Sequence, residues 1–293
     1  MPACKWGRIV AFTMLIVLQV RIGTAAPYTP WLDRGFHSLY NLDFAAAQRQ
    51  FAEHEQEHPE DPLGPTSEAA GLLFAELNRL GILDSAFFKD SSLSRVKSAP
   101  DATVYTQFDS ALRRAEEIAR NRLRRNGRDR DALFAVTLVA GLRADYAALI
   151  QHRGVAALGY TKTATNSAEQ LLAVYPDCYD AYVATGISRY LIGTLSMPAR
   201  WILRLGGFEG DKRRGVQDLT LAAERGHYLV PFARILLAIT FVRDKDAARA
   251  VEILSRLHDE FPDNPLFPKE LARLESNIRA SSRAADVHPK QRE

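Results

Sequence analysis

Two stretches of the chain align without gaps, namely DFAAAQRQFAEHEQEHPEDPL at residues 43–63 and DAARAVEILSRLHDEFPDNPL at residues 246–266. In this alignment, Ala47, Phe51 and Pro59 of the first stretch correspond to a small residue, a large apolar residue and a proline in the second. A small side chain lets two antiparallel helices touch, and a large one then fills the groove between them. The repetition therefore predicts stacked pairs of antiparallel helices.

The rest of the chain has helical periodicity interrupted by proline, glycine and Asn-Gly breakers, without long strand-like alternation. The predicted helices span residues 30–41, 44–58, 66–80, 101–126, 129–150, 154–175, 177–194, 211–225, 229–243, 245–261 and 265–280. They form about five pairs, at residues 30–58, 66–126, 129–175, 177–226 and 229–261, with the last helix as a cap. The predicted fold class is all-α, a solenoid of helix pairs in one domain.

Two insertions and a tail interrupt this pattern within and after the predicted solenoid, which covers residues 27–280. Residues 81–100 are rich in serine and are expected to form a loop. Residues 194–210 are too apolar for a solvated loop and predict a short packed helix. Residues 281–293 are polar and are expected to be a disordered tail.

The first 26 residues have the pattern of a signal peptide. Lys5 and Arg8 precede an apolar run at residues 9–20, and small residues follow it. Cleavage after Ala25 would place Gly23 at position −3 and Ala25 at position −1. The apolar run is shorter than the roughly 20 residues of a membrane span, although an uncleaved anchor is the alternative. We therefore expect a periplasmic or secreted protein.

Cleavage would change both the charge and the cysteine count. The chain of 293 residues has 38 basic and 35 acidic residues, and removal of Lys5, Arg8 and Arg21 makes the two numbers equal. A neutral protein has no general electrostatic attraction to nucleic acid, so we expect no nucleic-acid partner. Cys4 would be lost, leaving Cys178 as a single packed residue without a disulfide partner.

The helix pairs resemble tetratricopeptide repeat (TPR) units, in which Trp31 and Gly35 match the large and small positions of a first helix. Ala238 occupies the small position before the second stretch, and Tyr175-Pro176 closes a third unit. The segment MPARWILRLGGFEGDKRRGVQDL, residues 197–219, is similar to a motif of the inclusion-body-clearance TPR family and of secreted bacterial TPR proteins, with valine at 216 in place of leucine. The resemblance implies the fold and a binding role, but no reaction.

TPR stacks present the first helix of each pair on a concave face, where a protein or peptide partner binds. Tyrosine and arginine are frequent anchors of such contacts. The predicted partner-binding residues are Tyr179, Tyr182, Arg189, Tyr190 and Trp201. The alternative interpretation is that these aromatic residues pack under the 194–210 insertion. We expect a non-enzymatic scaffold without a cofactor, with membrane association only through an uncleaved signal peptide or a partner.

One catalytic motif matches literally, His54-Glu55-Gln56-Glu57-His58, which has the H-E-x-x-H spacing of zinc hydrolases. On a helix, His54 and His58 share a face and could bind one zinc ion, with Glu55 as general base. However, Pro59 ends the helix at once, and the repeat places this segment in the register of an ordinary helix end. A zinc hydrolase is therefore the alternative function, and a lipid- or apolar-ligand-binding protein with the 194–210 segment over a cavity is a third.

A run of eight arginines lies between residues 113 and 130, with Glu116, Glu117 and Asp129 among them. This run is either a patch for an anionic lipid or acidic segment, or a solvated helix face with internal pairs such as Glu116 with Arg120. The second interpretation is favoured because acidic residues are interleaved.

Overall fold

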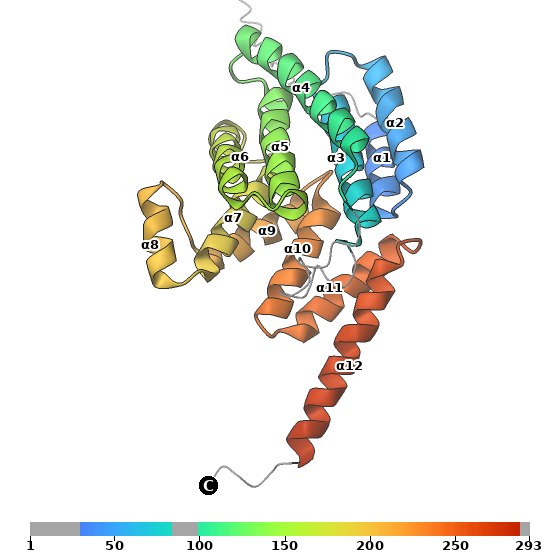
Figure 1. Cartoon of the computed structure of the whole chain (residues 1–293), viewed down its shortest axis with the longest axis vertical. Coiled ribbons are helices and arrows are strands. Elements are labelled where there is room, and N and C mark those ends of the chain that lie inside the picture. The colour runs from blue at the N-terminus through green and yellow to red at the C-terminus, as the bar shows by residue number, and fades with distance from the viewer. Residues whose placement is uncertain (1–29, 84–98, 288–293) are drawn as a thin grey trace, which may run out of the picture.

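The computed structural model describes residues 30–83 and 99–287, with side chains as far as residue 280. The predicted signal peptide (1–26), most of the 81–100 insertion and the end of the predicted tail lie outside the described residues. Within the described ranges every regular element is a helix, which confirms the all-α class (Figure 1).

The elements follow the predicted helices closely in position. In chain order they are α1 (Pro30–Tyr40), α2 (Phe44–Glu57), α3 (Leu63–Arg79), α4 (Ala102–Arg125), α5 (Arg130–Asp145), the π-helical turn η2 (Tyr146–Ile150), α6 (Gly154–Val174), the 3₁₀ turn η3 (Tyr179–Ala181), α7 (Tyr182–Thr194), α8 (Met197–Leu205), α9 (Lys212–Arg225), α10 (Val230–Arg243), α11 (Ala247–Glu260) and α12 (Leu266–Val287). The five predicted pairs are α1–α2, α3–α4, α5–α6, α7–α9 and α10–α11, each packed together, and α12 packs on α11.

The repeated small and large residues lie where the sequence places them. Ala47 and Ala250 are fully buried at the helix contacts, and Phe51 and Leu254 are buried beside them. Gly35 of α1 lies directly against the Phe51 ring, so a side chain at that position would collide with it. The contact between a small residue and a large one therefore closes the first helix pair, as the repeat predicts.

The two repeated stretches also share their polar ends. Asp43 and Asp246 each cap the following helix by accepting a backbone N–H three residues later. Asp61 accepts the N–H of Leu63 at 2.9 Å, and the equivalent Asn264 accepts the N–H of Leu266 at the same distance. The same turn chemistry therefore starts both α3 and α12.

The two ends of the helix stack contact each other along a seam. The Tyr40 hydroxyl donates to the carbonyl of Tyr228 at 3.0 Å, and the Asn264 amide donates to the carbonyl of Tyr40 at 2.7 Å. Phe74 of α3 meets Phe232 of α10 edge-on, with ring centroids 5.9 Å apart. The pocket beside this seam has a volume of about 60 Å³. Side chains from the first, second and last helix pairs therefore meet along this seam.

Three further findings differ from the sequence predictions. Residues 197–205 do form the predicted short helix, but none of their side chains is buried. The last helix continues to Val287, beyond the predicted end at residue 280, and extends away from the stack (Figure 1). One described helical stretch, Arg130–Ile150, is long and apolar enough to cross a membrane, but 56% of it is buried inside the protein between neighbouring helices. This burial is typical of a core helix.

Two glycines allow α7 and α9 to touch across the α8 insertion, and their replacement provides a test of this contact. A Cβ atom on Gly215 would lie 2.6 Å from the backbone nitrogen of Tyr190 and 2.7 Å from the carbonyl oxygen of Gly186. We expect Gly215→Ala to lower the free energy of unfolding by about 1–3 kcal/mol because the two backbones must separate. Urea unfolding followed by circular dichroism measures this effect.

The matched control is Gly159→Ala at an exposed position of α6, where no neighbouring atom lies within 4 Å of the added Cβ. Alanine is the better helix former, so this variant should gain about 0.5–1 kcal/mol. Equal stability of the two variants would contradict the close contact between α7 and α9.

Candidate functional site

A cluster of tyrosines and arginines surrounds the loop between α6 and α7. We name it the Tyr–Arg surface and define it by three half-buried tyrosines and two exposed arginines, Tyr175, Tyr179, Tyr182, Arg130 and Arg225. Tyr179 begins η3, Tyr182 begins α7 and Arg225 ends α9. The surface thus lies at the edge of the stack where one helix pair connects to the next.

Arg225 holds the first two tyrosines in place. Its guanidinium donates to the Tyr179 hydroxyl at 3.1 Å and lies 5.4 Å from the centre of the Tyr179 ring. The Tyr179 and Tyr182 rings are stacked, with centroids 6.3 Å apart. Within the described part of the chain, no carboxylate forms an ion pair with Arg225. Its charge is therefore available to a carboxylate from outside the chain.

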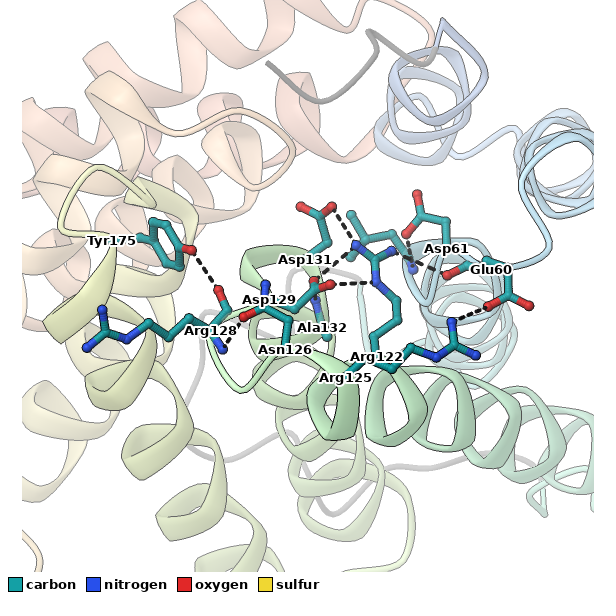
Figure 2. Close-up of polar contacts among 11 residues, drawn as sticks. Glu60, Asp61, Arg122, Arg125, Asn126, Arg128, Asp129, Asp131, Ala132 and Tyr175 are labelled. Atoms are coloured by element: carbon teal, nitrogen blue, oxygen red, sulfur yellow. Dashed lines mark hydrogen bonds and ion pairs between the residues drawn. The ribbon is translucent and has the colours of Figure 1, made fainter. Parts of the chain in front are cut away.

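Arg130 orders the third tyrosine on the other side of the loop. Its guanidinium lies 5.8 Å from the centre of the Tyr175 ring and donates to the carbonyl of Asp177 at 3.4 Å. The Tyr175 hydroxyl donates to the carbonyl of Arg128 at 2.6 Å, as Figure 2 shows. From the sequence, Tyr175 served only to close a repeat unit, Arg130 was counted in the arginine run, and Arg225 was not singled out. The sequence did mark these positions as helix ends. Arg130 lies at the start of one predicted helix, Arg225 at the end of another, and Tyr175 at the Tyr175-Pro176 breaker.

A buried carboxylate fixes the loop beneath the Tyr–Arg surface. Asp180 accepts the backbone N–H groups of His227, Tyr228 and Leu229 at 2.8, 3.1 and 3.1 Å. Burial raises the pKa of the Asp180 carboxyl, although these three donors act to lower it. Because Tyr179 precedes Asp180 and Arg225 precedes the anchored loop, this contact keeps the two side chains of the surface together.

The same edge continues towards α3 through an ion-pair network (Figure 2). Arg122 contacts Asp129 at 2.9 Å and Asp131 at 3.2 Å, and it also donates to the carbonyl of Glu60 at 3.3 Å. Arg125 lies 3.8 Å from the Glu60 carboxylate. These contacts connect the loop after α2 to the loop after α4, which makes the edge a continuous polar surface.

The arginine run is largely neutralised within the chain. Five of the eight form ion pairs with acidic side chains, Arg113, Arg114, Arg122, Arg125 and Arg130. The predicted pair of Glu116 with Arg120 does not form, because Glu116 pairs with Arg143 of α5 instead. An open pocket of about 410 Å³ beside this pair is lined by Glu116, Arg120, Leu123, Arg124 and Val136. The paired arginines agree with the favoured interpretation of a solvated helix face.

Two of the five predicted partner-binding residues lie in the protein interior, where they cannot serve as partner anchors. Arg189 is 7% exposed and forms ion pairs with Asp218 of α9 and Glu169 of α6. Tyr190 is 1% exposed, and its hydroxyl lies 3.3 Å from the carbonyl of Thr240. Periodicity identified their helix correctly, but it could not show that α6, α9 and α10 surround this part of α7.

Trp201 is separate from the tyrosines. It lies on α8 and is 65% exposed, whereas Tyr179 and Tyr182 lie at the Tyr–Arg surface. The five predicted residues therefore divide into an edge surface, the interior and the exposed α8 helix. The alternative of tyrosines packed under the 194–210 insertion is not what the structure has, because the Tyr190 hydroxyl contacts α10 and Tyr179 stacks with Tyr182.

The residues of the H-E-x-x-H motif make contacts that stabilise the fold. His54 is fully buried, and its Nε2 atom lies 3.0 Å from the Asp61 carboxylate at the start of α3. Glu55 receives a hydrogen bond from Arg114 of α4 at 3.1 Å, and the His58 ring lies tilted against that of His54 with centroids 4.8 Å apart. In the part of the chain that the structure describes, no three side chains of metal-binding type lie close enough to hold a metal ion.

Cys178 is a packed residue, as expected. It is 7% exposed, and burial raises the pKa of its thiol to about 11. Because the thiolate is the reactive form, this thiol is a poor nucleophile at neutral pH.

Comparison with known proteins gives a structural likeness without a family. No protein-family model matches the chain, and no curated protein matches it. Among solved structures, the chain is similar to a thermophilic TPR protein of Thermus thermophilus, at 15% sequence identity and a TM-score of 0.42. The likeness covers 83% of this chain and 96% of that one. The TPR-like architecture follows from the five helix pairs and their repeated contacts.

A histidine substitution separates a structural role of the H-E-x-x-H motif from a metal site. We expect His54→Ala to lower the free energy of unfolding by about 2–4 kcal/mol, because it opens a cavity and removes the contact to the Asp61 Oδ2 atom. His58→Ala, at a partly exposed position, should change it by less than about 0.5 kcal/mol. Thermal unfolding with and without zinc measures both effects, and zinc should leave the melting temperature of the unsubstituted chain unchanged.

The zinc hydrolase interpretation would be favoured again if zinc raised the melting temperature of the unsubstituted chain but not that of either histidine variant.

Proposed function

We propose that the chain is a non-enzymatic protein-interaction scaffold that binds its partner at the Tyr–Arg surface. The main support is the Arg225 guanidinium, which is exposed, stacked on Tyr179 and free of any ion pair with the described residues. An arginine fixed on an aromatic ring has little conformational freedom to lose, so a partner carboxylate can bind it at low entropic cost. Tyr182 offers an aromatic face beside it.

The partner that fits this surface is a protein segment with a carboxylate and an adjacent apolar side chain. The carboxylate would pair with Arg225, and the apolar side chain would cover the stacked Tyr179 and Tyr182 rings. The inner face of the stack is a weaker candidate where Phe74 and Phe232 contact each other across it.

We further propose that the scaffold acts in the periplasm or outside the cell. The main support comes from the amino-terminal sequence, where Lys5 and Arg8 precede an apolar run and the small residues around Ala25. The resemblance of residues 197–219 to secreted bacterial TPR proteins agrees with this location.

Site-specific photo-crosslinking in cells tests the partner surface. A benzoylphenylalanine residue at position 182 should give one dominant crosslinked protein, and the product should decrease at least about tenfold with Arg225→Ala because the charged anchor is lost. The control position is Arg256 on α11, whose side chain is 70% exposed and lies on another helix pair. A product that forms equally from both positions, or that does not depend on Arg225, would overturn the proposed surface.

Intact mass measurement tests the location. We expect the exported chain to begin at Ala26, and Ala25→Arg to abolish this cleavage because signal peptidase requires a small residue at position −1. A full-length chain recovered only from the cytoplasm would contradict the proposal.

A further inference from the structure

The α8 helix exposes an apolar side that no other part of the described chain covers. Met197, Trp201, Ile202 and Leu205 are 74%, 65%, 64% and 73% exposed. Their spacing places Met197, Trp201 and Leu205 on one side of the helix, with Ile202 next to them. In Figure 1, α8 stands apart from the stack at the outer side of α7 and α9.

The carboxyl end of α8 is ordered by backbone hydrogen bonds and contacts the stack. Gly207 has a positive φ of 77°, and the backbone N–H of Phe208 donates to the carbonyl of Leu203 at 3.1 Å. Together with the bond from Gly207 to the carbonyl of Arg204, this is the Schellman arrangement that ends a helix. Lys162 of α6 donates to the carbonyl of Gly206, which ties this end to the stack. The apolar side is therefore preformed in the folded protein.

The charges around α8 favour a negatively charged surface. The helix contains Arg200 and Arg204 and no acidic residue, and residues 195–214 together have five basic and two acidic side chains. Arg200 donates only to the carbonyl of Gly210, and within the described residues no ion pair reaches Arg204. This local excess contrasts with the neutral charge that the chain would have after signal cleavage.

We propose that α8 is an interfacial anchor that lies flat in the headgroup region of a membrane containing anionic lipid. A short amphipathic helix with tryptophan and leucine on one side and arginine on the other has the composition of such anchors. Met197, Trp201, Ile202 and Leu205 would enter the boundary of the acyl chains. Arg200 and Arg204 would meet the lipid phosphates.

A membrane fits α8 better than a folded protein does. The nine residues form a rod of about 13 Å that projects from the stack, so a protein partner would need a matching groove. A lipid interface adapts to a projecting helix, and tryptophan prefers this interface because its ring is apolar and its N–H is polar. From the sequence we expected membrane contact only through an uncleaved signal peptide or a partner, because the order of residues does not show that these side chains are exposed.

This anchor goes beyond the proposed function because it uses a different surface. The α8 side chains and the Tyr–Arg surface share no residue, so each can be removed while the other is kept. The chain with Tyr179→Ala and Arg225→Ala should bind vesicles as well as the unsubstituted chain does. Loss of crosslinking with intact vesicle binding, or the reverse, therefore shows which of the two proposals fails.

The test uses the chain beginning at Ala26 with Trp31→Phe, which leaves Trp201 as its only tryptophan. Vesicles of phosphatidylglycerol and phosphatidylcholine should shift the Trp201 emission to shorter wavelength and bind the chain in flotation, and phosphatidylcholine vesicles should do neither. Leu205→Glu should weaken binding at least about tenfold, because a charge would replace an inserted side chain. The matched control, Val174→Glu at another exposed apolar position, should leave binding unchanged.

The charge contribution has its own readout. Arg204→Gln should weaken binding to anionic vesicles about fivefold, whereas Arg204→Lys should bind them as well as the unsubstituted chain does. Raised salt should weaken binding of the unsubstituted chain more than that of Arg204→Gln. Equal binding to neutral and anionic vesicles, or no binding to either, would overturn the proposal. Self-association that Leu205→Glu abolishes in the absence of vesicles would also overturn it, because a second copy of the chain would then cover α8.

Discussion

Close contact between the two helices of each pair is the constraint on which the structure depends. Ala47, Gly35 and Ala250 leave room for this contact, and the large residues beside them then become buried. A tight contact fixes the angle between the helices, and the angle repeats from pair to pair. The curvature of the stack follows from that repetition. Bulky residues at these positions would therefore alter the whole stack and not one contact alone.

The curvature brings the first and last pairs together, and this closure moves the binding surfaces outward. Tyr40 and Asn264 connect the two ends through hydrogen bonds, and Phe74 meets Phe232 across the inside. Both proposed binding surfaces lie away from this seam, at the edge where loops join successive pairs and at the insertion between α7 and α9. The Tyr–Arg surface and α8 occupy these two places.

The helices were predictable from sequence, whereas the environment of single side chains was not. Periodicity and the repeat at Ala47 and Ala250 depend on local spacing, which sequence records directly. The burial of Arg189 depends on Asp218 and Glu169, which come from two other helices. His54 shows the same limit, since its motif suggested zinc and its position in the fold is that of Leu257, a core residue of the other repeat. Contacts between distant segments decided both cases.

The position of α8 explains why its apolar residues point to a function and not to folding. Gly186 and Gly215 bring α7 and α9 into direct contact, so this helix pair closes without any buried side chain from α8. An exposed apolar cluster promotes aggregation in water and adds nothing to the stability of the fold. Contact with another surface removes this tendency to aggregate, because it covers the same side chains. A helix that Lys162 ties to the stack, but that buries none of its own residues, is therefore best explained by what it binds outside the chain.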